Sequence, residues 1–344
     1  MVYPNILEDI KKCIALNIPG KVPIFAISMD FDIKYCGINR IDYGRIFKKM
    51  VESSIKVVKE FDYDWILLHP DDYIEFEGII KTKEDKKIPA RPAGYIEPTL
   101  ENIKKLKIPN FRKDFRMPVY LEALSKIKEI MGNDICLTGR LAAPFSSAAL
   151  IFGISETMML TIENNDIMRR VLDYSIALQI EWGREQIKSG ADAIWIGDCV
   201  ASSKFISPNT YERFAAKGAK IVSEEIKKAG GIAYYHAAES SKHHLEIMSD
   251  LGFDIINIGE EIEIKEAKEF INDKVCISGN LSPIKVLENG TIEDIKRETK
   301  KIMLDGKENG GFIFNTEEGI PDPTPEENIR AMIKTAKKYR YYSN

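Results

Sequence analysis

The sequence has few cysteines and few histidines for its length. Its 344 residues include five cysteines and four histidines. The cysteines are odd in number, widely spaced and without a CxxC pair, which argues against a disulfide framework and a self-contained zinc finger. We therefore interpret most of the cysteines as small core residues.

A dominant charge and long hydrophobic runs are also missing. The net charge is −4, and Lys and Arg are dispersed, which argues against a basic surface for nucleic acid. No uninterrupted apolar stretch is long enough to cross a bilayer, and the first residues contain acids without an apolar run of signal-peptide type. We expect a cytoplasmic protein that binds neither nucleic acid nor membrane.

What the chain does contain is a regular alternation of apolar runs and helix-period segments. The runs lack apolar–polar alternation, as is typical of parallel strands covered on both faces. Eight such strands, each followed by a helix, predict one α/β domain over residues 1–344, a (β/α)8 TIM barrel with an N-terminal helical extension. The predicted strands are 22–28, 65–69, 135–140, 193–197, 231–236, 254–258, 275–280 and 312–314, and the helices are 42–61, 118–131, 163–188, 207–229, 239–251, 262–271, 292–304 and 324–339.

Residues 70–117 interrupt this rhythm. They are rich in Pro, Lys and acids and much longer than a usual connection between a strand and a helix. We interpret them as an insertion after the second strand, which forms either a lid over the barrel mouth or an inert surface loop.

Polar side chains follow most of the predicted strands. Because the carboxyl ends of barrel strands open on one mouth, we expect these side chains to share a cavity. Carboxylates and imidazoles crowded together need a cation, shared protons or hydrogen-bond partners, and a metal is the economical explanation. The residues are Asp30, Asp32, His69, Asp71, Arg140, Asp198, Cys199, His236, Glu239, Asn257, Glu260, Glu261, Asn280, Asn315, Glu317 and Glu318.

His236 is the strongest candidate metal ligand. It ends an apolar strand, and Glu239 follows three residues later; zinc binds His nitrogen together with Cys sulfur or carboxylate oxygen, and a catalytic zinc keeps one position open. The alternative is a hydrogen-bonded His without metal. Cys199 is a further candidate ligand, although we favour a packed thiol. His243 and His244 lie inside a predicted helix, and we expect them on or near its surface.

Other strand-end residues each have two interpretations. Asp71 is either a general acid or base or a cap of the following segment. Arg140 either binds an anion or pairs with a neighbouring acid, and Asn280 is either a hydrogen-bond donor to a ligand or a turn residue. Tyr235 is one of several aromatic residues that line a pocket for an apolar molecule or only pack the mouth.

The last strand and helix form one unit with acids in the loop between them. Glu317 and Glu318 follow the strand 312–314, and Thr324 is predicted as the N-cap of the last helix with Pro325 at its first position. Ligands bind at such loops in parallel α/β proteins, so this unit is a candidate for chemistry.

Several segments together resemble the uroporphyrinogen decarboxylase superfamily. The resemblance runs from about Val22 to the C-terminus and implies a (β/α)8 barrel. The segments are Thr138–Ser146, Ser189–Ser202 followed by Ile206–Pro208, Ser278–Pro283 and Gly319–Asn328.

The true decarboxylases of this superfamily hold substrate carboxylates with an Arg-rich segment after the first strand and use an Asp after the second strand. Here the stretch Ile27–Tyr35 has no Arg and two acids, so a tetracarboxylate would be repelled. Asp71 does fall near the family Asp. The chain is more similar to the other branch, the cobamide-dependent methyltransferases.

Members of that branch that act on thiols bind zinc through a His-x-Cys motif and a Cys after the last strand. This chain keeps the His as His236, but Ala238 and Glu318 stand at the two Cys positions. The loss of two soft ligands argues against thiol activation. The resemblance then implies a harder zinc site of His236 and Glu318 with either Glu239 or Asp198 as a third ligand, in which zinc polarises the oxygen of a methyl ether.

The sequence therefore predicts a corrinoid-dependent methyltransferase that takes a methyl group from a small methylated, for example methoxylated, donor. We recognise no cobalamin-binding domain, so the corrinoid would be carried by a partner protein. The alternatives are a decarboxylase of another carboxylated small molecule and a non-catalytic binding barrel, and a homodimer is one option for assembly. The predicted catalytic residues are Glu318, Asp71 and His236, and the predicted substrate-binding residues are Asp198, Asn280, Tyr235 and Arg140.

Overall fold

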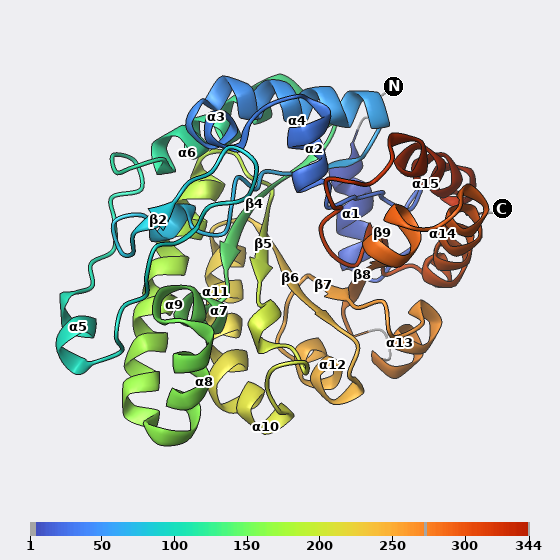
Figure 1. Ribbon diagram of the computed structural model, residues 1–344. Helices are drawn as coiled ribbons and strands as arrows, with labels where there is room; N and C mark the ends of the chain where they lie inside the picture. Colours follow the sequence, from blue (N-terminus) through green and yellow to red (C-terminus); the bar gives the residue numbers. More distant parts are fainter. Residues whose placement is uncertain (1–4, 272–273, 343–344) are drawn as a thin grey trace.

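A computed structural model describes residues 5–271 and 274–342. Within them, seven parallel strands form one curled sheet with helices around its outer face (Figure 1). This is a TIM-barrel-like α/β fold, as predicted from the apolar runs. The strands, in the order of the sheet, are β1 (Trp65–Leu67), β4 (Cys136–Ala142), β5 (Ala193–Gly197), β6 (Ile232–Glu239), β7 (Ile255–Ile258), β8 (Cys276–Leu281) and β9 (Phe312–Thr316).

The segment predicted as the first strand, residues 22–28, is not a regular strand. Phe25 N donates to Phe314 O at 2.9 Å, and Asp64 N donates to Ile24 O at 3.0 Å, so the segment lies between β9 and the start of β1. It makes only an isolated bridge at Ile24. The reason is local, because Pro23 has no N–H to donate and the Ile24 N–H is taken by the Asp64 side chain.

The helices follow the predicted segments with some breaks. The segment 207–229 contains a π-helical stretch at Tyr211–Ala216, and 42–61 is divided near Ile46. The α-helices are α1 (Ile6–Ile14), α2 (Met29–Tyr35), α3 (Arg40–Arg45), α4 (Phe47–Phe61), α5 (Leu100–Lys105), α6 (Met117–Met131), α7 (Pro144–Phe152), α8 (Ile154–Glu163), α9 (Asn165–Lys188), α10 (Pro208–Thr210), α11 (Lys217–Lys228), α12 (Lys242–Ser249), α13 (Ile264–Ile271), α14 (Ile292–Lys307) and α15 (Glu326–Tyr339).

Helix α1 packs against the interior of the sheet at the end opposite the carboxyl ends of the strands. Its residues Ile6, Ile10 and Cys13 are fully buried and belong to one apolar cluster with side chains such as Trp65 and Ala193, which stand near the starts of β1 and β5. This helix closes one end of the curled sheet. The polar residues of the candidate site therefore lie at the other end of the sheet, at the carboxyl ends of the strands.

The connection between β1 and α6 corresponds to residues 70–117, which we interpret from the sequence as an insertion. It contains a short antiparallel pair, β2 (Thr82–Lys83) and β3 (Arg91–Pro92), and then α5. Helix α5 contacts α9, at the left of Figure 1. A lid function for this connection stays a prediction.

Two local predictions are wrong. The last helix begins at Glu326 with Pro325 as its N-cap, and the Thr324 hydroxyl has no hydrogen-bond partner in the described residues. His244 is buried with 1% exposure rather than near the surface, because it packs against the Tyr211 ring.

The helices were also compared with the length and hydropathy of a membrane span. Among the described residues, no single helix is long and apolar enough to cross a bilayer; the bent pair α7 and α8 meets those criteria only when taken together.

Candidate functional site

Three side chains from different strand ends meet in one group. Cys199, His236 and Glu318 each offer one ligand atom, and these atoms lie within 4.8 Å of one another. The His236 Nε2 atom is 3.0 Å from Glu318 Oε1, and the Cys199 thiol donates to the same oxygen at 3.4 Å. Two of the three, His236 and Glu318, are predicted ligands, and Cys199 is the third.

The backbone at each strand end explains why these side chains converge. After β5, Asp198 opens a 3₁₀ turn over Cys199–Ala201 that carries the thiol. In β6 the register shifts between His236 and Glu239, and Ala238 adopts a φ of 47°. Such a left-handed conformation is strained for a residue with a Cβ and is held only by its surroundings.

The loop after β9 is tied down on both sides of Glu318. Glu317 N donates to Leu281 O at 2.9 Å, and Ile320 N donates to Ile27 O at 2.7 Å. These two bonds anchor the loop to β8 and to the segment beside β9. Glu318 therefore has a fixed backbone position although it lies outside the strand.

The His236 imidazole is the strongest indication that this group holds a cation. His236 is fully buried, and neither ring nitrogen has a hydrogen-bond partner of good geometry in the described part of the chain. A buried imidazole whose nitrogens lack well-aligned hydrogen bonds is costly, even with Nε2 at 3.0 Å from Glu318 Oε1. A metal ion bound to one nitrogen, together with the thiolate and a carboxylate oxygen, would remove that cost.

Without a cation, the thiol of this group is protonated and the Glu318 carboxyl is ionised. Burial, together with the nearby Glu318 carboxylate, raises the pKa of the Cys199 thiol well above its ordinary value. Burial also opposes ionisation of Glu318, but the His236 imidazole outweighs it and lowers the pKa of that carboxyl. A divalent cation would deprotonate the thiol outright, and a sulfur, nitrogen and oxygen donor set with an open position is typical of catalytic zinc.

Glu239, the third predicted ligand, lies outside this group. Its two carboxylate oxygens accept hydrogen bonds from Ser203 at 2.7 Å, and Oε1 also accepts from the backbone N–H groups of Ser240 and Ser241. The carboxylate therefore holds two loops together.

Asp198 and Tyr235, two predicted substrate-binding residues, bind each other in the layer between strands and helices. The Tyr235 hydroxyl donates to Asp198 at 2.7 Å, and the other oxygen of Asp198 accepts from the Ser146 hydroxyl at 2.7 Å and from the Ser146 N–H. Burial raises the pKa of Asp198 to about 6. The structure thus places Asp198 at the start of α7, where its acceptors are satisfied within the protein.

Asn280 is also engaged with the backbone. Its side-chain amide donates to Gly259 O at 2.8 Å and to Ile262 O at 2.7 Å. The residue lines a cavity of about 190 Å³ that lies outside the Cys199–His236–Glu318 group, between β8 and α14. Its role as a substrate ligand stays a prediction.

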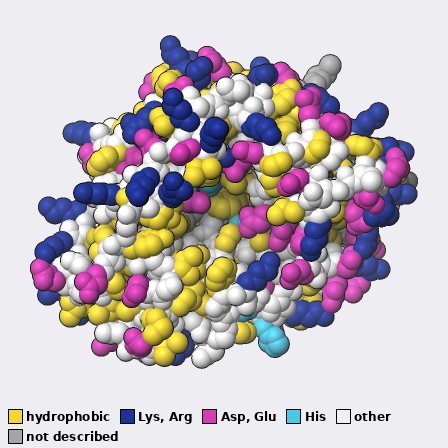
Figure 2. Space-filling model, in the orientation of Figure 1, with side chains coloured by type: hydrophobic (Ala, Val, Ile, Leu, Met, Phe, Trp, Pro, Cys, Tyr) yellow, Lys and Arg dark blue, Asp and Glu magenta, His cyan; other side chains and the backbone are white. Residues whose placement is uncertain are grey.

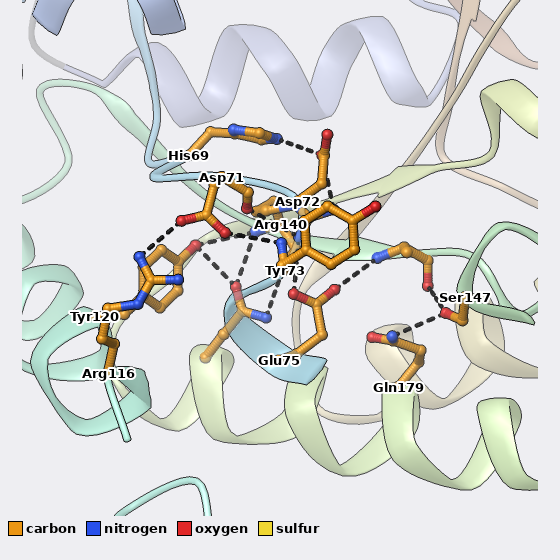
Figure 3. Close-up of polar contacts among 12 residues, drawn as sticks. His69, Asp71, Asp72, Tyr73, Glu75, Arg116, Tyr120, Arg140, Ser147 and Gln179 are labelled. Carbon is orange, nitrogen blue, oxygen red and sulfur yellow. Dashed lines mark hydrogen bonds and ion pairs between the residues drawn. The ribbon is translucent and has the colours of Figure 1, made fainter. Parts of the chain in front are cut away.

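The two adjacent acids after β1 have different surroundings (Figure 3). Asp71 is buried, and its carboxylate is 2.7 Å from Arg116 Nη1 and accepts from Tyr73 N. Asp72 is 55% exposed at its side chain, and its Oδ1 lies 3.2 Å from His69 Nε2. The predicted catalytic acid, Asp71, is thus held inside the protein, whereas Asp72 reaches open space.

Arg140, predicted to bind substrate, lies between two carboxylates. Its Nη1 is 2.8 Å from the fully buried Glu75, and its Nη2 is 3.4 Å from Asp72. The Arg140 Nε has no partner among the described residues. Of the two interpretations made from the sequence, the structure shows pairing with neighbouring acids.

The indole of Trp195 packs against two histidines, His236 of the candidate metal-ligand group and His69 beside Asp72. Its ring centroid is 4.5 Å from that of His236 and 5.9 Å from that of His69. Gly197 makes this possible, since a Cβ there would lie 2.4 Å from the indole. Figure 2 shows a hollow over the strands, with histidine side chains at its base and acidic side chains gathered along one rim.

Sequence reasoning underrated Cys199 and passed over Asp72. The signal for Cys199 was its place directly after a predicted strand, beside Asp198. The signal for Asp72 was weaker. Pro70 stands between His69 and the two acids, and beyond a proline the alternation of strand side chains does not predict which acid faces the cavity.

Comparisons with known proteins match nearly the whole chain. The family model "Uroporphyrinogen decarboxylase (URO-D)" matches residues 30–339. The chain is 30% identical over 248 residues to a methylcobamide:CoM methyltransferase, MtbA, of Methanosarcina mazei, covering 72% of this chain and 71% of the relative. It is also 30% identical over 306 residues to a uroporphyrinogen decarboxylase of Prochlorococcus marinus, covering 84% of both chains.

A solved structure has the same fold. A methyltransferase from Methanosarcina mazei superposes with a TM-score of 0.86 at 21% identity, covering 95% of this chain and 97% of that one.

Proposed function

The chain belongs to the uroporphyrinogen decarboxylase family, and we propose that within it the protein is a cobamide-dependent methyltransferase. It takes a methyl group from a small methylated, for example methoxylated, donor and passes it to a corrinoid carried by a partner protein. The similarity to methylcobamide:CoM methyltransferases supports the general reaction. The methylated donor and the bound metal are further parts of our proposal.

The group of Cys199, His236 and Glu318 carries the proposal. These residues would hold one zinc ion by sulfur, nitrogen and oxygen, with a position open for the donor. When bound, the zinc would polarise the oxygen of a methyl ether, and the corrinoid would receive the methyl group.

The chain's own residues supply position and charge. His236 is fixed by burial and by Trp195, against which its ring lies at 4.5 Å. Glu318 is fixed by the anchored loop after β9 and, at 40% side-chain exposure, faces the open side of the group. Such fixed groups act because they stand where charge develops on the leaving oxygen and need no reorganisation during the reaction.

Glu317, beside Glu318, adds a proton-holding group at the mouth. Burial, Glu260 and Glu318 together raise the pKa of Glu317 to about 7. Without a bound cation, a fraction of this carboxyl is therefore protonated at neutral pH. It is suited to giving a proton to a leaving alkoxide or phenoxide, as a general acid with a pKa near the working pH.

The test is methyl transfer to free cob(I)alamin, followed by its absorbance, with a panel of methoxylated and other small methylated donors. We expect zinc-loaded wild-type protein to convert at least one donor and His236→Ala to be inactive and to lose zinc. A zinc-free wild type that cannot be loaded, or a zinc-loaded protein inactive with every donor, would contradict the proposal.

A further inference from the structure

The second polar cluster of the mouth lies across Trp195 from the Cys199–His236–Glu318 group. It consists of Asp72, His69 and Arg140, with Glu75 behind them. Since Trp195 contacts both His69 and His236, the two imidazoles can be no farther apart than the sum of their distances to the indole. The clusters are therefore close enough to contact the two ends of one small molecule.

The chain is built so that Asp72 is the carboxylate facing the hollow. Its neighbour Asp71 is withdrawn by Arg116, whereas Asp72 keeps more than half of its side-chain surface exposed while bonded to His69 (Figure 3). Asp72 is thus an open hydrogen-bond acceptor.

The neighbours of Asp72 keep it ionised. Partial burial opposes ionisation, but the hydrogen bond from His69 and the charges of His69 and Arg140 outweigh this and lower the pKa of Asp72. Arg140 cannot offer that charge to a ligand instead, because Glu75 holds its Nη1 and the side chain is almost completely buried. Asp72 is the exposed carboxylate of this cluster, because the Glu75 side chain is fully buried.

The other charged groups near the rim are of both signs. Glu318 is a partly exposed carboxylate, Lys285 is paired with Glu260 at 2.5 Å, and Lys204 is near enough to Glu317 to oppose the rise of its pKa. Directly beside Asp72, an anion is disfavoured, and a group that brings a hydrogen-bond donor or a positive charge is favoured.

We infer that Asp72, oriented by His69 and Arg140, is a substrate subsite that accepts a hydrogen bond from an O–H or N–H group of the methyl donor. The inference rests on the proposed function for the identity of the other end, the methyl-bearing atom at the Cys199–His236–Glu318 group. The substrate class is a small molecule with a methylated heteroatom at one end, a hydroxyl or ammonium group at the other, and no negative charge.

Binding of four matched probes tests this without turnover. They are 2-methoxyethylammonium, 2-methoxyethanol, 1,2-dimethoxyethane and methoxyacetate, which share one end and differ at the other. Affinities for the zinc-treated protein are measured by ligand-observed NMR titration. We expect the ammonium to bind most tightly, the alcohol next, and dimethoxyethane more weakly, since a hydrogen bond to a charged group contributes enough for roughly tenfold in affinity. Methoxyacetate, whose carboxylate can bind the zinc directly, reports on access to the zinc.

Asp72→Asn removes the charge but keeps the shape. We expect it to weaken the ammonium probe on the order of tenfold and to leave dimethoxyethane unchanged. Asp250→Asn is the matched control, because Asp250 is 60% exposed at its side chain and paired with Lys274 at the far end of β8. It should change no affinity.

The inference is overturned if dimethoxyethane binds as well as the ammonium, if Asp72→Asn leaves the order of affinities unchanged, or if no probe binds. These outcomes are separate from failure of the proposed function. A protein that binds the probes through Asp72 but transfers no methyl group would contradict only the methyltransferase proposal. A protein that transfers methyl groups without any dependence on Asp72 would contradict only the inference of a subsite at Asp72.

Discussion

The Cys199 sulfur lies 3.4 Å from a carboxylate oxygen of Glu318, although 119 positions separate the two residues in the sequence. One follows β5 and the other follows β9. Parallel strands that curl into a TIM-barrel-like sheet bring such ends together. With His236 from β6, this contact makes a three-residue group in which the thiol stands beside the carboxylate instead of the predicted Glu239.

Metal content distinguishes the two candidate third ligands. We expect about one zinc per chain in the wild type and a loss of zinc affinity of at least roughly tenfold in Cys199→Ser, because a hydroxyl is a poorer zinc ligand than a thiolate. Glu239→Gln should retain zinc, since its oxygens are occupied by Ser203 and the following backbone. The measurement is zinc per chain after dialysis against a competing chelator.

The circular dichroism spectrum of each variant serves as the control for folding. Zinc lost from Glu239→Gln and kept by Cys199→Ser would reverse the assignment.

The adjacent acids Asp71 and Asp72 should differ in their effect on stability. Asp71→Asn weakens a buried ion pair with Arg116, which still keeps Glu77 at 2.5 Å. We therefore expect a loss of about 2 kcal/mol, below the roughly 3–5 kcal/mol seen when a buried charge loses its whole partner. Asp72→Asn should cost less than about 1 kcal/mol, because its carboxylate is exposed. Urea unfolding measures both, and equal losses would contradict the distinction.

Asp32 should make stability depend on pH. Burial raises the pKa of Asp32 to about 7, with Asp30 adding to the shift and a hydrogen bond from Ser28 opposing it. In the unfolded chain the pKa of an Asp is about 3.9. The contribution of Asp32 to the free energy of unfolding is therefore most favourable below that pH and is lost as the pH rises to about 7.

Asp32→Asn, which cannot ionise, should therefore become more stable relative to the wild type by roughly 2–3 kcal/mol as the pH rises from about 5 to about 8. Urea unfolding of both proteins across this range gives the difference, in which the other titrating groups cancel. A difference independent of pH would show that Asp32 is ionised throughout.

Helix α1 should contribute to global stability through its apolar face. Ile10 is fully buried against the interior of the sheet, and Ile10→Ala should cost roughly 2–4 kcal/mol as burial is lost and a cavity is left. Ile18→Ala is the comparison, since Ile18 is 56% exposed and should change the free energy of unfolding by less than about 0.5 kcal/mol. Similar values for the two would mean that α1 unfolds before the rest of the protein.

Much of the fold could be predicted because its signals are local. Seven of the eight predicted strands are regular strands in the described residues, since an unbroken apolar run bounded by turn residues is read from neighbouring positions alone. The prediction of the eighth strand, residues 22–28, was wrong. The Ile24 N–H donates to the side chain of Asp64, 40 positions away, and is therefore not available for a hydrogen bond to a neighbouring strand.

The site was predicted less completely than the fold. Residues of the right kind were identified at the strand ends, and His236 and Glu318 do meet. Asp198, Tyr235 and Asn280 were placed at the same ends, but their side chains bond to each other or to neighbouring backbone. Strand position decides which residues are near the mouth, whereas the direction of each side chain depends on bulges and turns that the pattern does not encode.

By itself the sequence determined the α/β alternation, the acidic character of the strand ends and the family, because each depends on residue types in order along the chain. Only the tertiary structure decided that Cys199 rather than Glu239 stands with His236, and that Asp72 rather than Asp71 faces the hollow. Both choices depend on distant partners, Glu318 in the first case and Arg116 in the second. Such partners act through space, and their effect exists only once the chain has folded.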